Sequence, residues 1–232
     1  MNNAAYLQRR GQLEQYFDRT AVRAWERLTS DAPVSRIRAS VRAGRDRMRR
    51  AMLDLLPMNL HGRRILDAGC GTGALAQELA GRGADVLAID LSPTLVELAR
   101  QRSSAAGASS VEFRSGDMSD PTLGKFDHVV AMDSLIHYEA DDIVRMLATL
   151  SQRTRHSLLF TFAPRTPALA LMHAVGRVFP RSDRAPAIAP VAETGLRSRL
   201  AQDTKLRDWQ VARGERIAGG FYTSQVMELV RQ

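Results

Sequence analysis

The feature that most constrains the fold is a regular alternation of apolar and amphipathic segments between residues 61 and 163. Short apolar segments predict five strands, at 63–69, 84–90, 111–117, 126–132 and 156–163. Segments with helical character lie between them, at 73–83, 92–105 and 140–152. The second of these begins with an N-capping Ser92 and with Pro93 at the first helical position. Because apolar strands that alternate with helices are typical of a parallel sheet covered on both faces, we expect a doubly wound α/β fold with a mostly parallel, Rossmann-like sheet.

The regions on either side of this alternation have a different character. Apolar residues recur at helical spacing within 13–28 and 34–55, and most arginines of the second stretch are expected on its opposite side. Residues 164–190 combine a short helical stretch with a loop rich in Pro and Arg, and strands near 208–217 and 221–230 complete the sheet. We therefore expect an N-terminal helical arm or lid over 1–60 and one α/β domain over 61–232. Within that domain, residues 164–200 form a helical and loop insertion on the substrate side.

Composition limits the class of protein and its compartment. A length of 232 residues suits one domain with additions. Cys70 is the only cysteine, so no intramolecular disulfide can form and we expect a reducing compartment. The longest apolar runs are shorter than the ~18–20 residues that a membrane span needs. The N-terminal stretch also lacks the apolar core of a secretory signal, so we expect a cytoplasmic protein.

Charge is distributed unevenly along the chain. The net charge is +6 over residues 1–60, −5 over 61–150 and +7 over 151–232, and nearly all cations are arginines. The planar guanidinium suits carboxylates and phosphates. An acidic substrate, a nucleic acid or an anionic membrane could therefore meet the basic flanks, and a solvated arginine-rich surface is the alternative.

The segment ILDAGCGTGALA at 65–76 is the strongest functional signal. Asp67 ends a strand, and three glycines then alternate in a turn before a helix. Glycine permits a positive φ and leaves no Cβ to keep a ligand from the backbone. Asp90 ends the next strand, where its carboxylate can accept hydrogen bonds from ribose hydroxyls. The pattern predicts a nucleoside-containing cofactor.

The spacing separates two kinds of cofactor. A dinucleotide favours G-x-G-x-x-G, whereas this turn reads D-x-G-x-G-x-G. The Asp67 carboxylate would repel a pyrophosphate and suit an ammonium group. The turn resembles that of class I S-adenosylmethionine-dependent methyltransferases, and GDMSD at 116–120 resembles their next element, which borders the adenine. The resemblance implies a cofactor-binding set of Asp67, Gly69, Cys70, Gly71, Gly73, Asp90, Leu91, Asp117, Met118 and Met132.

The methyl acceptor must be inferred from the stretch MDSLIHY at 132–138. This stretch follows the fourth strand, at the edge of the sheet where ligands bind in such folds. It contains no NPPY-like tetrapeptide for adenine methylation. The single cysteine lies inside the glycine turn, so it is not placed to attack cytosine. Small-molecule or protein methylation remains.

Five stretches spread over nearly the whole chain together resemble one family. They are YFDRTAVRAWERL at 16–28, the glycine turn, MDSLIHY, FTFAPRTPALALMHAVGRVFP at 160–180 and FYTSQVMELV at 221–230. They resemble the magnesium-protoporphyrin IX O-methyltransferases of chlorophyll and bacteriochlorophyll synthesis. The resemblance implies transfer of a methyl group from S-adenosylmethionine to a propionate carboxylate of magnesium protoporphyrin IX. It also implies association with a magnesium-chelatase subunit and peripheral attachment to the inner, photosynthetic membrane.

The residue types on the expected substrate side suit a flat apolar ring with acidic side chains. Aromatic contact could come from Tyr16, Phe17, Trp25, Phe162 and Phe179, although core packing is the favoured alternative for Trp25 and Phe162 individually. Arg165, Arg177, Arg181 or Arg184 could pair with the carboxylates. Our expected substrate-binding residues are Trp25, Ser134, Arg165, Arg177 and Arg181. We expect no metal site built from the protein's own side chains.

The chemistry leaves the role of His137 open. A propionate, with a pKa near ~4.3 like glutamate, is already ionised at neutral pH, so it needs no strong base. His137 could orient the carboxylate, ligate the porphyrin magnesium or cap the strand, and we predict a functional role. Relatives commonly carry a tyrosine a few residues after the arm tryptophan, where this chain has Thr29. Tyr16 is the nearest substitute as a catalytic group, and Tyr138 is expected to point away from the site.

Two alternatives remain open. The same turn would serve methylation of another amphipathic small molecule, such as a quinone precursor. A basic nucleic-acid-binding module that keeps a methyltransferase core is weaker, because the flanks lack an RNA-binding motif, and we expect no nucleic-acid partner.

Overall fold

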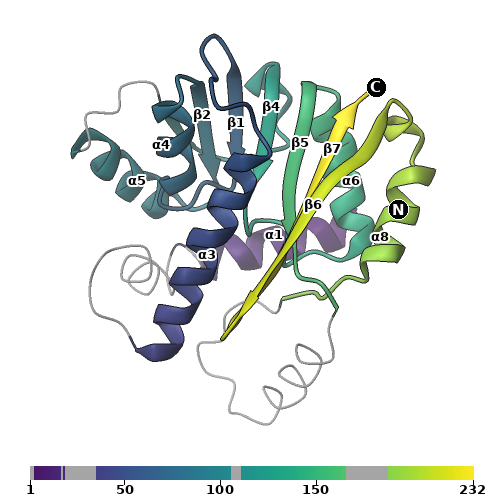
Figure 1. Cartoon of the computed structure of the whole chain (residues 1–232), viewed down its shortest axis with the longest axis horizontal. Helices are drawn as coiled ribbons and strands as arrows, with labels where there is room; N and C mark the ends of the chain where they lie inside the picture. The colour runs from purple at the N-terminus through teal and green to yellow at the C-terminus, as the bar shows by residue number, and fades with distance from the viewer. Residues whose placement is uncertain (1–2, 17, 19–34, 106–110, 166–187) are drawn as a thin grey trace.

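A computed structural model describes residues 3–16, 18, 35–105, 111–165 and 188–232. Its centre is one seven-stranded sheet in the order β3-β2-β1-β4-β5-β7-β6 (Figure 1). The five strands β1 (Arg64–Ala68), β2 (Asp85–Asp90), β3 (Val111–Ser115), β4 (Phe126–Ala131) and β5 (Thr154–Phe162) are parallel. The strand β7 (Tyr222–Arg231) is antiparallel to β5 and to the edge strand β6 (Trp209–Gly219). The expected doubly wound α/β fold is confirmed.

The register brings the ends of the central strands to one level. Asp67 of β1 is paired with Ala88 of β2 and with Val130 of β4. The loops after these strands therefore open at the same edge of the sheet, where the strand order reverses between β1 and β4. In an open parallel sheet this is the position at which ligands bind.

Helices cover both faces of the sheet. On one face lie α3 (Arg36–Asp54), α4 (Ala74–Gly81) and α5 (Pro93–Ala105). On the other lie α6 (Ala140–Ser151) and α8 (Glu193–Gln202). Alternate strand residues supply the two cores, as Ile65 and Leu66 of β1 do, and both are fully buried. Two 3₁₀ turns, η2 (Pro121–Leu123) and η3 (Thr204–Leu206), complete the described elements.

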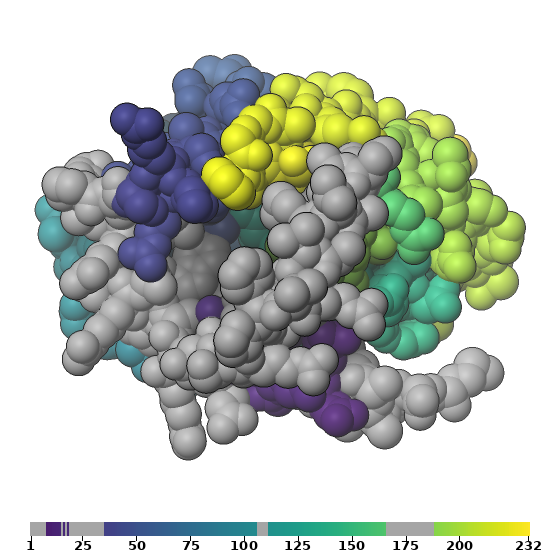
Figure 2. Space-filling view, turned by 90° about the horizontal axis from the view of Figure 1, so that it is seen from below, coloured from purple at the N-terminus to yellow at the C-terminus, as the bar shows by residue number. Residues whose placement is uncertain are grey.

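The described part of the arm is attached to the edge of the sheet that carries the ligand position. Helix α1 (Asn3–Gln15) crosses below the strands (Figure 1), and its Leu13 is buried in the core. Arg10 forms an ion pair with Asp117 at 2.9 Å. Seen from below, α3 and the β6–β7 hairpin lie side by side (Figure 2), and the Phe221 backbone N–H donates to Ser40 Oγ at 3.2 Å.

The predicted strands and the helices between them are confirmed, with ends that differ by at most two residues. Ser92 caps α5 as expected, since Leu95 N–H donates to its Oγ at 3.2 Å. Helix α8 falls mostly within the expected helical and loop insertion at 164–200, although no helix was placed at its position, and its Leu196 and Leu200 are buried in the core that also contains α6 residues. Most of the expected insertion at 164–200 and about a third of the arm at 1–60 lie outside the described residues.

Candidate cofactor and acceptor site

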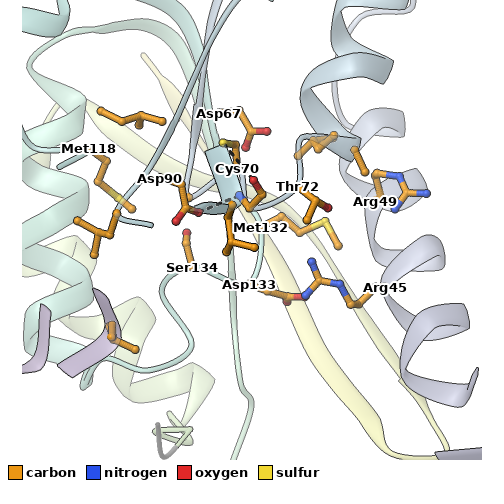
Figure 3. Close-up of a pocket in the computed structure, with 18 of the residues that line it drawn as sticks. Arg45, Arg49, Asp67, Cys70, Thr72, Asp90, Met118, Met132, Asp133 and Ser134 are labelled. Carbon is orange, nitrogen blue, oxygen red and sulfur yellow. Dashed lines mark hydrogen bonds and ion pairs between the residues drawn. The ribbon is translucent and has the colours of Figure 1, made fainter. Parts of the chain in front are cut away.

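A cavity of about 320 Å³ opens at the C-terminal edge of β1, β2 and β4. The glycine turn, the loops after β2, β3 and β4, one face of α3 and Leu13 of α1 line it. Figure 3 shows acidic side chains, Asp67 and Asp90, at the strand ends, whereas Arg45 reaches in from α3 toward Asp133. Such a cavity suits a ligand that carries both a cation and an anion.

Gly69 and Gly71 of the turn are glycines for two different structural reasons. Gly69 has a φ of 87°, and a Cβ there would lie 2.3 Å from the Ser134 Cβ, so this glycine lets the loop after β4 approach the turn. Gly71 has a φ of 53°, and a Cβ there would meet nothing within 4 Å. Gly71 therefore exposes bare backbone to the cavity, as a close-lying ligand requires. Gly73 is the N-cap of α4 and is not among the lining residues.

Asp67 is a buried carboxylate with an unsatisfied atom. Its side chain is almost fully buried, and Oδ2 has no hydrogen-bond partner in the described structure. Burial, together with the negative charge of Asp90, raises the pKa of Asp67 to about 7. A nearby cation stabilises the ionised form of a buried carboxylate. The α-ammonium group of a methionine moiety is such a cation.

Asp90 supports the turn that it borders. Its Oδ2 accepts from Gly71 N–H at 2.8 Å, and its Oδ1 accepts from Ser92 N–H at 3.0 Å. Burial raises the pKa of Asp90, and the backbone donors oppose that shift. Burial and Asp90 also raise the pKa of the Cys70 thiol, which therefore stays protonated. Each carboxylate oxygen has two lone pairs, so a ribose hydroxyl can still donate to Asp90.

The remaining predicted cofactor residues fall into two groups. Leu91, Met118 and Met132 line the cavity, with Ile89 and Leu95 adding apolar surface suited to an adenine. Asp117 was expected to border the adenine but is not among the lining residues. Its carboxylate instead pairs with Arg10 and accepts from Ser119 N–H at 2.8 Å, so it holds α1 to the loop after β3.

The loop after β4 supplies the acceptor side of the cavity. Ser134 and His137 both line it, and Ser134 Oγ has no hydrogen-bond partner in the described structure. His137 is 7% exposed. Tyr138, which we expected to point away from the site, is also among the lining residues, and it is buried in the core that contains α6 residues.

Three arginines of α3 line the cavity, a role that the sequence prediction did not give them. They are Arg42, Arg45 and Arg49, which recur at intervals of three and four residues. They lie outside the buried core that α3 forms with its apolar residues, in agreement with the expected helical pattern. Arg49 pairs with Asp46 at 2.9 Å and with Glu78. The spacing was the signal that could have found them.

The predicted substrate residues are only partly described. Trp25, Arg177 and Arg181 lie outside the described residues, as do Phe17, Phe179 and Arg184. Arg165 is exposed just after β5, and Phe162 is fully buried, in agreement with core packing. Tyr16 is half-buried and is not among the described residues that line the cavity.

Comparison with known proteins finds both a general methyltransferase domain and one specific family. A model of the general methyltransferase domain matches residues 65–157. A model of the magnesium-protoporphyrin IX methyltransferase C-terminus matches residues 131–231. The magnesium-protoporphyrin O-methyltransferase of Rhodobacter capsulatus is 49% identical over 96% of this chain and 97% of its own length. The chain belongs to the magnesium-protoporphyrin O-methyltransferase family. The expected resemblance is thereby confirmed.

A solved structure supports the same family assignment. The magnesium protoporphyrin IX methyltransferase of Synechocystis with bound S-adenosylhomocysteine superposes with a TM-score of 0.84 at 28% identity, covering 96% of this chain and 99% of that one. A ubiquinone biosynthesis O-methyltransferase of Xanthomonas euvesicatoria is 38% identical, but over only 51% of each chain. The similarity to the porphyrin enzymes therefore extends over parts of the chain that the quinone enzyme does not match.

Proposed function

We propose that this chain transfers the methyl group of S-adenosylmethionine to a propionate carboxylate of magnesium protoporphyrin IX. The product is the monomethyl ester of (bacterio)chlorophyll synthesis. The observation that carries the proposal is the 49% identity to the Rhodobacter capsulatus enzyme over 96% of the chain. The cavity supports it, because an unsatisfied carboxylate, a glycine that leaves the backbone bare and an apolar wall suit this cofactor.

In this proposal the cofactor half of the cavity binds and orients. Asp67 holds the α-ammonium group, Asp90 accepts from the ribose, and Met118 lies in the apolar wall beside the adenine. Bound S-adenosylmethionine supplies a methyl group on a positively charged sulfur, which an oxygen nucleophile can attack. The neutral Cys70 thiol adds no charge beside that sulfur.

The acceptor half positions a nucleophile that is already ionised. Since a propionate has a pKa near ~4.3, no residue needs to remove a proton from it. His137 and Ser134 can donate hydrogen bonds that fix the direction of the carboxylate, and orientation of this kind can contribute ~7–11 kcal/mol. Apolar contacts from Leu13 and Met132 reduce the water around the attacking oxygen.

The arm at 1–60 is proposed to act as a lid on this site. Three contacts support the proposal: Leu13 lines the cavity, Arg10 pairs with Asp117, and Thr94 Oγ1 donates to Asp18 Oδ1 at 2.6 Å. Tyr16 lies between these contact points in the sequence, and we retain it as a candidate substrate contact. Trp25 and the arginines at 165, 177 and 181 remain proposed contacts of the porphyrin and its carboxylates.

The place of action is also a proposal. None of the described helices is long and apolar enough to cross a membrane. We propose action in the cytoplasm with peripheral attachment to the inner, photosynthetic membrane, and delivery of the substrate by a magnesium-chelatase subunit. Both associations are implied by the family resemblance, and a large apolar ring that water dissolves poorly is consistent with them.

The second candidate function is methylation of a quinone precursor, favoured by the half-length similarity to a ubiquinone enzyme. A competition assay separates the two. Purified protein is given labelled S-adenosylmethionine with equal amounts of magnesium protoporphyrin IX and a catechol quinone precursor, and the products are separated. We expect label in the porphyrin monomethyl ester, whereas label in the catechol ether alone would replace the porphyrin proposal.

A further inference from the structure

Asp133 is a buried carboxylate to which three elements donate hydrogen bonds. Its side chain is 4% exposed and pairs with Arg45 of α3, with Nη1 and Oδ2 2.8 Å apart. The Tyr222 hydroxyl donates to the same carboxylate at 3.0 Å, and the Ser224 hydroxyl donates at 3.4 Å. From β5, Thr161 Oγ1 donates to Oδ1 at 3.3 Å and accepts from the Asp133 backbone N–H at 2.7 Å. These donors fix the carboxylate from α3, β5 and β7.

The backbone of Asp133 adopts a conformation that is unfavourable for a residue with a side chain. Its φ is 53°, and among the described residues it is the only one other than glycine with a positive φ. A non-glycine residue in this region is held there by its surroundings at a cost of about 1–3 kcal/mol. Strain of this kind concentrates where a side chain must be aimed. Asp133 is followed directly by Ser134 of the acceptor side.

What Asp133 aims is the guanidinium of Arg45. Arg45 lines the cavity with a side chain that is 20% exposed, on the α3 side that faces Asp90 and Ser134 (Figure 3). Gly44 lets the Tyr222 ring pack against α3, because a Cβ there would lie 2.5 Å from the ring. The ion pair and the ring together set the direction of the Arg45 side chain. A guanidinium carries five N–H donors in a rigid plane, so one group can bind Asp133 and a second carboxylate at once.

The charges of the cavity indicate which ligand group meets this side. Asp67 and Asp90 repel a carboxylate, whereas Arg42, Arg45 and Arg49 attract one. Arg49 is neutralised by Asp46 and Glu78. Arg45 pairs with Asp133 and itself lines the cavity.

We propose that Arg45 binds a ligand carboxylate in this cavity and that Asp133, together with Tyr222, is the positioning residue that aims it. The inference rests on the proposed function, which offers two carboxylates: that of the cofactor's methionine moiety and a propionate of the porphyrin. Both present the same chemistry to a guanidinium.

Two binding measurements, neither of which needs turnover, distinguish these sources. The first compares S-adenosylhomocysteine with its decarboxylated analogue, 5′-deoxy-5′-(3-aminopropylthio)adenosine, by calorimetry. The second compares magnesium protoporphyrin IX with its dimethyl ester by the shift of the visible absorption band. The wild-type chain is expected to prefer the carboxylate in at least one pair by about 10- to 100-fold, the range for a charge-assisted hydrogen bond.

Substitution of Arg45 identifies the source. Arg45→Gln should abolish the preference in the first pair if the cofactor carboxylate is bound, and in the second pair if the propionate is bound. Arg45→Lys should restore part of the preference for the carboxylate ligand, because lysine carries the positive charge but lacks the planar guanidinium that makes two parallel hydrogen bonds. Arg50→Gln, an exposed arginine of the same helix that does not line the cavity, is the matched control and should retain the wild-type preference. If Arg45→Gln keeps both preferences, or if the wild type shows neither, the inference is overturned.

The positioning role has its own readout. Asp133→Asn, which tolerates the same backbone conformation, should lower the preference several-fold in the wild type. In the Arg45→Gln background, Asp133→Asn should cause no further loss of this preference, because Asp133 acts through Arg45. An equal loss in both backgrounds would show that Asp133 serves the fold alone. Failure of the proposed function would appear separately, as an absence of methyl transfer by the wild type.

Discussion

At the scale of single residues, Asp67 explains why the cavity favours a cationic ligand. The fold buries this carboxylate, leaves Oδ2 without a partner and places Asp90 nearby. The pKa of Asp67 therefore rises from 3.8 to about 7. A ligand cation would oppose that shift, since its positive charge stabilises the ionised carboxylate and supplies Oδ2 with a contact. Asp67 thereby makes ligand binding and protonation compete.

This competition predicts a pH dependence of ligand binding. Since only the ionised carboxylate attracts a cation, the affinity for S-adenosylhomocysteine should rise as the pH increases through about 7 and then level off. Calorimetry between pH 5.5 and 8.5 measures it. Asp67→Asn should bind at least 10-fold more weakly at pH 8 and lose the dependence. An Asp67→Asn variant with the wild-type profile would show that another group titrates.

The same pKa predicts how the ligand-free chain responds to pH. The folded-state pKa lies above the unfolded value, so the contribution of Asp67 to stability is fully present below pH ~4 and is lost as the pH rises through about 7. The upper limit of the loss is about 4 kcal/mol. Denaturant unfolding at pH 5 and pH 8 checks this, with Asp67→Asn as the control. The difference between wild type and variant should change with pH, and a constant difference would contradict the assignment.

His137 gives a second prediction at this scale. If it orients the propionate, His137→Ala should lower kcat by about 100-fold, the cost of misplacing a reacting group by roughly 1 Å. Binding of S-adenosylhomocysteine should stay within twofold of wild type. Single-turnover rates and calorimetry measure the two quantities. An unchanged kcat would assign His137 to the fold.

At the scale of elements, α3 is a wall of the site because it can approach β7 closely. Gly44 lies in the middle of this helix, where alanine would normally be favoured by about 1 kcal/mol. The Tyr222 ring occupies the space where a Cβ would be. Gly44 thus lowers the intrinsic helix propensity of α3 but allows α3 to contact β7. The residues Tyr222 and Ser224 of β7 donate hydrogen bonds to Asp133.

A substitution tests this exchange. Gly44→Ala should destabilise the chain by about 1–3 kcal/mol through overpacking, despite the better helix propensity of alanine. The matched control is Gly11→Ala in α1, where a Cβ meets nothing within 4 Å, and which should be neutral or stabilising. Denaturant unfolding measures both. Equal effects of the two substitutions would contradict the close contact of α3 with Tyr222.

The elements also show how far the sequence predicts the structure. Local patterns were sufficient for the strands and for the turn around Gly69 and Gly71, because periodicity and glycine spacing act over a few residues. The Arg45–Asp133–Tyr222 network was not predicted, since its two contacts join residues 88 and 89 positions apart and no local pattern encodes such contacts. The ion pair of Asp117 with Arg10 of the arm was likewise not predicted, since the motif at 116–120 says nothing about contacts with α1.

At the scale of the whole molecule, the site joins the arm to the sheet. Residues of α1, α3 and four strand-end loops share one cavity, so a ligand in it contacts parts that are distant in sequence. A ligand at 100 times its Kd stabilises the folded state by about 2.7 kcal/mol. Saturating S-adenosylhomocysteine should therefore raise the Tm by roughly 5–10 °C. At the same ligand concentration, Asp67→Asn should lower the shift by about half or more, as a 10-fold or greater loss of affinity requires. An undiminished shift would place the ligand elsewhere.

The most direct test of the central claim is methyl transfer by the purified wild-type chain. Labelled S-adenosylmethionine and magnesium protoporphyrin IX are incubated with the protein at pH 8, and the porphyrins are separated by chromatography. The dimethyl ester of the same porphyrin is the control acceptor, because it has no free carboxylate. We predict label in a monomethyl ester of the diacid and none in the control. The absence of a labelled ester from an intact chain that binds S-adenosylhomocysteine would contradict the proposed function.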